Sequence, residues 1–180
     1  MARIDWRMVM DTSKSEHTSE SAIASVLQAR GLLVAKPYFD QRGADLLGFR
    51  HICGGAKFCR IQSKYRQAGS HISIPAHYVP GAFVCIAYVV PKLGSDKDLT
   101  KHALYSFLSE DIMQWNLNAG NYVLSLPSFE TCTKLFKNSV LDDRNFERLC
   151  RLIDESTVQD EMRMLDFSNP NNSGLLAAIL

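Results

Sequence analysis

The stretch that decides the fold is residues 44–66, ADLLGFRHICGGAKFCRIQSKYR, in which two strand-like segments flank Gly54 and Gly55. The first segment is ADLLGF at 44–49, and the second is KFCRIQSKYR at 57–66. Both are rich in the residue types that strands prefer, and a glycine pair between two such segments favours a turn. The stretch is therefore predicted to form two neighbouring strands joined by a hairpin.

Segments on both sides of this hairpin extend the prediction to an α/β fold. An apolar stripe at 22–27 indicates a helix that begins at Ser19 and ends at Gly31, and LLVAKP at 32–37 follows as a short strand. AFVCIAYVV at 82–90 is almost wholly apolar, which is typical of a strand buried on both faces near the middle of a sheet. This order predicts a mixed β-sheet flanked by helices.

The part of the chain after residue 91 gives folding signals and little chemistry. ALYSFL at 103–108 and YVLSL at 122–126 are predicted strands. Ser109 is a predicted helix start, Ser128 a predicted helix cap, and Asp143 is expected to open a helix with one apolar face.

Length and composition indicate a single domain. With 180 residues, the chain is expected to hold an arm or short edge strand at 1–14, one domain at 15–166 and a tail at 167–180. No apolar run is long enough to cross a membrane, and the N-terminus lacks a secretory pattern. Five cysteines, an odd number without framework spacing, favour a reducing cytoplasmic setting.

Two carboxylates lie where the pattern expects burial, and two further polar residues share one face of the neighbouring strand. Glu20 precedes Ile23 by three residues and therefore shares the helix stripe that packs on the sheet. Asp45 stands at the start of an apolar strand, and Gln62 and Lys64 project to one face of the next strand. An inward carboxylate is costly unless it is paired, protonated or bound to a metal. The hairpin is expected to bring the four side chains together at one sheet edge.

These residue types suit a divalent cation such as Mg²⁺, which prefers hard oxygen ligands and retains waters or substrate phosphate. Asp45 is the best ligand, Glu20 assists directly or through water, and Gln62 offers its amide oxygen. The backbone carbonyl of Ser63 is an additional ligand. Lys64 can orient or deprotonate a water molecule, or neutralise charge that builds on a phosphate. The constellation therefore favours phosphodiester hydrolysis.

The order of these residues resembles the core of the PD-(D/E)XK nuclease superfamily, in its restriction-endonuclease-like and Holliday-junction-resolvase-like branches. The resemblance covers residues 17–90 and rests on Glu20, on GADLLGF with Asp45, and on CRIQSK with Gln62 and Lys64. It implies a restriction-endonuclease-like core and an endonuclease that cuts DNA with Mg²⁺ or Mn²⁺, with RNA as the second choice of substrate. Two cuts on a duplex need two sites, so a homodimer is expected, through the late helices or the apolar C-terminal end.

Gln62 is the main departure from the superfamily pattern, in which most members have Asp or Glu. An amide still offers an oxygen, but the missing negative charge should weaken binding of a cation. Gly43-Ala44 also replaces the proline that often precedes the aspartate. The alternative hypothesis is therefore a catalytically decayed module of the same fold that binds nucleic acid or a protein partner.

Basic residues gather between Arg42 and Arg66, whereas acidic residues dominate after 141, so the formal net charge of +1 conceals an asymmetry. Arg42, Arg60, Arg66 and Tyr65 are the expected nucleic-acid contacts, with packing beneath the strand as the alternative for Tyr65.

Other candidates are weaker. Asp40 and Glu16 are secondary acids, both expected to be solvated. His51, Cys53 and Cys59 lack the paired spacing of most structural zinc sites, so cysteines that fill the core are favoured. The segment between His71 and His77 could cross a substrate groove, but exposed loop histidines are favoured over a phosphate or structural role.

Overall fold

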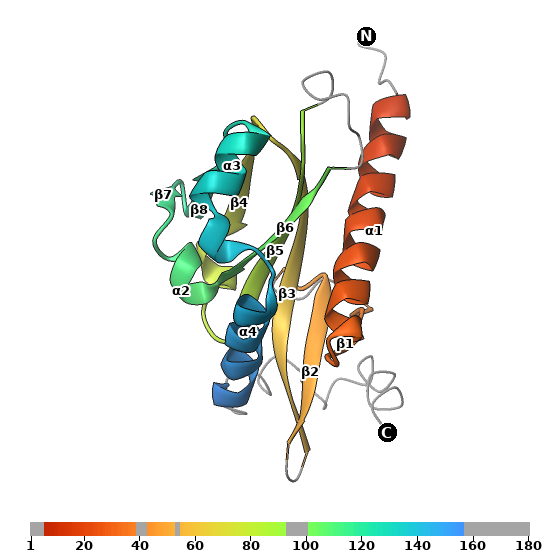
Figure 1. Cartoon of the computed structure of the whole chain (residues 1–180), viewed down its shortest axis with the longest axis vertical. Coiled ribbons are helices and arrows are strands. Elements are labelled where there is room, and N and C mark those ends of the chain that lie inside the picture. Colours follow the sequence, from red (N-terminus) through yellow and green to blue (C-terminus); the bar gives the residue numbers. More distant parts are fainter. Residues whose placement is uncertain (1–5, 39–42, 53–54, 93–100, 157–180) are drawn as a thin grey trace.

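The computed structural model describes residues 6–38, 43–52, 55–92 and 101–156 (Figure 1). Within these ranges a five-stranded sheet carries the predicted hairpin, and a helix precedes it. The predicted α/β class, with a mixed sheet flanked by helices, is confirmed.

The large sheet has the order β1-β2-β3-β5-β6. Its strands are β1 (Leu33–Ala35), β2 (Leu46–Ile52), β3 (Gly55–Gln67), β5 (Phe83–Val90) and β6 (Ala103–Leu108). Strands β3 and β5 run parallel, and the other neighbours run antiparallel, so the sheet is mixed. The strands expected in residues 32–66, 82–90 and 103–108 are all present.

Helix α1 (Trp6–Ala29) is longer than its apolar stripe indicated. Residues 6–14 are helical and continuous with the predicted helix, so the expectation of a short edge strand in the arm is wrong for this part. The apolar stripe marks only the part of α1 that packs on the sheet, where Ser19, Ile23 and Leu27 are buried. At its other end, Gly31 has a positive φ of 89°, a conformation that favours glycine, and the helix ends there as expected.

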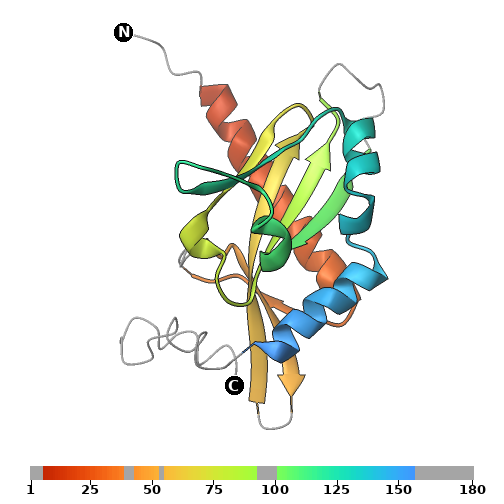
Figure 2. The ribbon, with the colours of Figure 1, turned by 90° about the vertical axis from the view of Figure 1, so that its left-hand side faces the viewer.

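A second sheet was not foreseen. It has the order β4-β8-β7 and is formed by β4 (His71–Pro75), β8 (Asn121–Ser125) and β7 (Asn116–Asn118). The segment between His71 and His77 is therefore mainly a strand, followed by the 3₁₀ helix η1 (Ala76–Tyr78), and the expectation of a loop there is wrong. Figure 2 shows α1 on one side of the large sheet and the β4–β8–β7 sheet on the opposite side.

Two apolar clusters fill the space on the two faces of the large sheet. One joins α1 and α4 (Asp143–Glu155) to residues such as Ile61 and Val84, and the other joins β4 and α3 (Phe129–Leu135) to residues such as Cys85 and Phe107. Alternate residues of β5 enter the two clusters, so this strand is buried on both faces, as its composition predicted.

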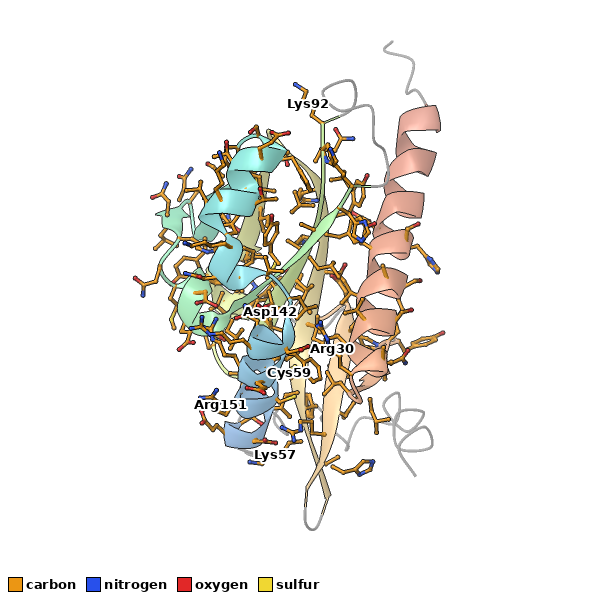
Figure 3. The ribbon with its side chains drawn as sticks, in the orientation of Figure 1. Arg30, Lys57, Cys59, Lys92, Asp142 and Arg151 are labelled. Carbon is orange, nitrogen blue, oxygen red and sulfur yellow. The ribbon has the colours of Figure 1, made fainter. Side chains whose placement is uncertain are left out.

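The helix cap predicted at Ser128 and the helix start predicted at Asp143 are confirmed. Ser128 accepts a hydrogen bond from Thr131 N at 3.3 Å before α3, and Asp142 accepts one from Asn145 N at 2.9 Å before α4. Ser109 opens only the short helix α2 (Ser109–Ile112), and a second 3₁₀ helix, η2 (Lys137–Ser139), separates α3 from α4. Figure 3 shows Arg30 between α1 and the beginning of α4, where its Nη1 donates to Leu141 O at 2.8 Å.

In the described ranges, no helix combines the length and apolar character that a membrane span requires.

Candidate functional site

The side chain of Asp45 is held at the edge of β3, just before β2 begins. Its backbone N donates to Ile61 O at 2.9 Å, and its carboxylate Oδ2 accepts from Ser63 N at 2.7 Å. The carboxylate thus replaces the backbone acceptor that a longer β2 would supply. A charge-assisted hydrogen bond of this kind fixes the carboxylate relative to β3.

Gln62 and Lys64 project to the face of β3 that is opposite α1. Ile61, between Arg60 and Gln62, belongs to the cluster that α1 and α4 cover, and side chains alternate along a strand. The β2–β3 register pairs Leu46 with Ile61, so its continuation sets Asp45 opposite Gln62. Residues directly opposite in an antiparallel pair share a face, which brings Asp45, Gln62 and Lys64 to the same side of the sheet.

The electrostatics of Cys85 support this grouping. Cys85 is paired with Gln62 across the parallel strands, and burial raises the pKa of its thiol to about 12. The charges of Lys64 and Arg66 act to lower that pKa, and the charge of Asp45 acts to raise it. All three charges therefore lie close enough to the thiol to influence its ionisation.

The amide of Gln62 carries an unpartnered oxygen. Gln62 is 6% exposed, and its Oε1 is buried with no hydrogen-bond partner in the part of the chain that the structure describes. A buried acceptor without a partner costs about 1–3 kcal/mol, so most such groups in proteins are satisfied. An oxygen held at this cost, on the face that Asp45 and Lys64 share, fits a position for a bound ligand.

Ser63 adds a main-chain oxygen near the same edge. Its N–H points to the β2 side of β3, where Asp45 accepts it. In an extended strand, the C=O of a residue points to the same side as its N–H, so the Ser63 carbonyl also lies on that side. The oxygens of Asp45, Gln62 and Ser63 are those that the sequence predicts as ligands, and among them only the Asp45 carboxylate carries a charge.

Glu20 lies on α1, on the side of the large sheet opposite to the face that Gln62 and Lys64 share, so the structure does not gather it with them as expected. Its carboxylate is 2.5 Å from Lys36 Nζ, and its side chain is 19% exposed. The two residues line an open cavity of about 220 Å³ between α1, β1 and β2. The buried helix positions are Ser19 and Ile23, so Glu20 stands at the edge of the stripe that was expected to hold it. Sequence reasoning missed Lys36 as its partner.

Arg60 is built into the fold rather than exposed to a phosphate. Its side chain, 2% exposed, donates from Nη1 to Tyr78 O at 2.8 Å and from Nη2 to Pro80 O, and it stacks over the ring of Phe83 at 5.3 Å. The expectation that Arg60 contacts phosphate is therefore wrong, because its guanidinium donates hydrogen bonds to carbonyls of the η1 loop instead.

The η1 loop that Arg60 holds also packs against the segment leading to Asp45. Gly43 has a positive φ of 73°, and a Cβ atom at this position would lie 2.3 Å from Cδ2 of Tyr78. Both the conformation and the contact require glycine. Tyr78 is thus held through its carbonyl by Arg60, and its ring packs against Gly43 in the segment that leads to Asp45.

Arg66 and Tyr65 are partly engaged within the fold. Arg66 Nε donates to His71 O at 3.0 Å, and its Nη1 donates to Tyr65 O at 2.7 Å, while the side chain stays half-buried. The Tyr65 ring stacks on Tyr88 with centroids 6.0 Å apart, and Tyr88 stacks on His102 at 4.9 Å. Packing is thus the observed environment of Tyr65, and Arg66 still presents part of its surface.

The remaining sequence candidates separate into three groups. Arg42, Asp40 and Cys53 lie outside the described residues. Glu16, His71 and His77 are exposed, whereas Cys59 is fully buried in the core, as expected for a strand cysteine. Where the structure is described, no three His, Cys, Asp or Glu side chains gather closely enough to hold a metal ion.

Comparisons with known proteins give a distant structural likeness. No family model and no curated protein matches the sequence. Among solved structures, the chain is similar to Archaeoglobus fulgidus Hjc, a Holliday junction resolvase from an archaeal hyperthermophile. The TM-score is 0.40 and the identity 14%, over 71% of this chain and 91% of that chain. Because the TM-score and the identity are this low, the candidate site residues are argued only from contacts within this chain.

Proposed function

We propose that this protein is a divalent-metal-dependent endonuclease that hydrolyses phosphodiester bonds in DNA. The observation that carries the proposal is the buried Oε1 of Gln62, which has no partner among the described residues and lies on the face that Asp45 and Lys64 share. A cation bound there would satisfy this oxygen, and the carboxylate of Asp45 would supply negative charge. Oxygen donors of this type suit Mg²⁺ or Mn²⁺.

The roles follow from the position of each group. Asp45, Gln62 and the Ser63 carbonyl would hold the ion, and Glu20, on the α1 side of the sheet, would assist through water once its carboxylate left Lys36. When bound, the ion would polarise a phosphodiester and increase the acidity of a nearby water. Lys64, half-buried on the same face, would neutralise charge that builds on the phosphate or orient the attacking water. Arg66 is the best-placed described arginine for contact with the DNA backbone, since Arg60 is buried.

The decisive experiment replaces Asp45 by Asn and titrates Mn²⁺. Because the amide oxygen still accepts from Ser63 N, we expect the free energy of unfolding to change by only about 1 kcal/mol. The affinity for Mn²⁺ should fall by about a hundredfold or more, since a charged ligand is lost. Nicking of supercoiled plasmid and of a four-way DNA junction should disappear with it.

Asp143→Asn is the matched control, because the Asp143 side chain is 96% exposed at the start of α4. This variant should bind Mn²⁺ and cut DNA like the unmodified protein. A saturable Mn²⁺ site that survives Asp45→Asn would contradict the proposed ligand. Single-stranded RNA in the same assay decides between DNA and RNA, and sedimentation equilibrium tests the proposed homodimer.

A binding module without catalysis is the second candidate. Three observations favour it: the neutral side chain at Gln62, the ion pair of Glu20 with Lys36, and the single carboxylate in the donor set. A decayed site of this kind would bind DNA in the presence of a chelator, with an affinity that falls as salt rises. Salt-sensitive DNA binding with neither Mn²⁺ binding nor cleavage would establish this function instead.

A further inference from the structure

Ser63, between Gln62 and Lys64, makes a buried contact with α1 through its hydroxyl. Its Oγ lies 3.2 Å from Ser19 Oγ, and the two residues are 8% and 1% exposed. Ser19 Oγ donates its proton to Glu16 O at 2.8 Å. A hydroxyl has one proton to donate, so Ser63 is the donor in the Ser19–Ser63 hydrogen bond. The result is a directed chain from β3 to Ser19 and on to the backbone of α1.

This contact is specific because it is buried. The surrounding helix face is apolar, with Ile23 and Leu27 fully buried, and a hydroxyl taken there without a partner would be penalised. Apolar packing alone would let α1 slide on the sheet by a small distance at little cost. A single buried hydrogen bond fixes the position of the helix along β3.

The backbone of Ser63 makes the second contact. Its N–H donates to Asp45 Oδ2 at 2.7 Å, while its hydroxyl reaches Ser19, the residue before Glu20. One residue thus joins the segment before β2, the middle of β3 and the helix. These are the three elements that carry the proposed metal ligands.

We infer that Ser63 and Ser19 are positioning residues for the proposed metal centre, an inference that rests on the proposed function. The hydroxyl pair holds α1 against β3, and this keeps the Ser63 amide aimed at Asp45 and Glu20 beside the sheet edge. Neither hydroxyl touches the cation or the substrate. Their effect is transmitted through Asp45 and Glu20, as outer-shell partners act at other metal sites.

The experiment measures Mn²⁺ affinity in Ser63→Ala, Ser19→Ala and the double variant, at a temperature where all are folded. Each single variant should weaken Mn²⁺ binding by about tenfold, the lower end of the effect of outer-shell changes. The double variant should be no weaker than the weaker single variant, because both changes break one interaction. Ser63→Thr, which keeps the hydroxyl, should restore the affinity.

Ser25→Ala is the matched control. Ser25 lies on the same helix, and its hydroxyl donates to Ser21 O at 2.8 Å on the exposed side. Its removal should leave the Mn²⁺ affinity unchanged. Unchanged affinity in folded Ser63→Ala and Ser19→Ala would overturn the inference, and Ser19→Ala supplies the test alone if Ser63→Ala does not fold.

Amide hydrogen exchange of Ser63 in metal-free protein separates this inference from the proposed function. Ser19→Ala should speed exchange of the Ser63 N–H by about tenfold, because local opening becomes easier, and Ser25→Ala should not. If the unmodified protein binds no Mn²⁺, the proposed function fails, and this exchange rate still decides whether the hydroxyl pair fixes the Ser63 amide. An exchange rate unaffected by Ser19→Ala would refute that.

Discussion

The two faces of β3 differ in how completely their side chains are satisfied. Toward α1, Cys59 and Ile61 are fully buried in an apolar cluster, and Ser63 is paired with a helix hydroxyl. Toward the second sheet, Arg60, Gln62 and Lys64 bring two cations and an amide to the same strand. Arg60 there donates from Nη1 and Nη2 to two carbonyls, whereas the buried Oε1 of Gln62 has no hydrogen-bond partner among the described residues.

On the proposed function, this difference separates a face that stabilises the fold from one that would carry the chemistry. A satisfied face lowers the free energy of the folded chain, and a buried unsatisfied group raises it. Functional sites are common places for such a cost, because groups arranged for a ligand are incompletely satisfied without it. Substitutions on the two faces should therefore affect different measurements.

The largest contrast is expected between Ile61→Ala and Lys64→Ala. Ile61→Ala leaves a cavity in the core and should lower the free energy of unfolding by about 2–5 kcal/mol. Lys64→Ala, at a half-buried position, should change it by less than about 1 kcal/mol while abolishing DNA cleavage. Denaturant unfolding and plasmid nicking measure the two effects. Cleavage that persists in Lys64→Ala would contradict the proposed role of Lys64 in catalysis.

A smaller effect is expected for Arg60→Met, which tests whether this arginine belongs to the fold. Loss of its charge-assisted hydrogen bonds to the carbonyls of Tyr78 and Pro80 should cost about 2–3 kcal/mol of stability. The slope of DNA affinity against salt concentration should not change, since a buried arginine neutralises no phosphate. Arg66→Met is the comparison, and it should reduce that slope. A reduced slope in Arg60→Met would mean that the loop opens to expose Arg60.

The smallest effect, with opposite sign, is expected at Gln62. Gln62→Leu removes the unpartnered oxygen and should stabilise the metal-free protein by about 1 kcal/mol while weakening Mn²⁺ binding. Gln62→Glu places a second carboxylate beside Asp45, so it should destabilise the metal-free protein and strengthen Mn²⁺ binding. Thermal unfolding with and without Mn²⁺ resolves both changes. If Gln62→Leu destabilises the metal-free protein, the Gln62 oxygen has a partner in solution.

Much of the fold was predictable because its determinants are local. The hairpin, the buried strand at 82–90 and the capped helices each carry their pattern within a few residues. The second sheet was not predictable, because β4 pairs with β8 across a long separation, and its partner at 121–125 gave only a strand signal. Pairing of distant strands depends on packing that no local window contains.

The candidate site divides in the same way. The alternation along β3 was enough to place Gln62 and Lys64 on one face, and the hairpin register brought Asp45 there. The position of Glu20 depends on a rotation of α1 by about one residue, which puts Ser19 in the buried stripe instead. The same uncertainty hid Ser19, although a serine four residues before Ile23 was a usable signal. The burial of Arg60 depends on the η1 loop, which no pattern in the strand could reveal.

The contact between Gly43 and Tyr78 has a consequence for how this sequence can vary. A methyl group at position 43 would collide with the Tyr78 ring, and Tyr78 cannot withdraw freely because its carbonyl accepts from Arg60. Changes at Gly43 are therefore tolerated only together with changes at Tyr78. In a library that randomises both positions, glycine should predominate at 43 because of its positive φ, and clones with a larger residue there should carry a smaller one at 78.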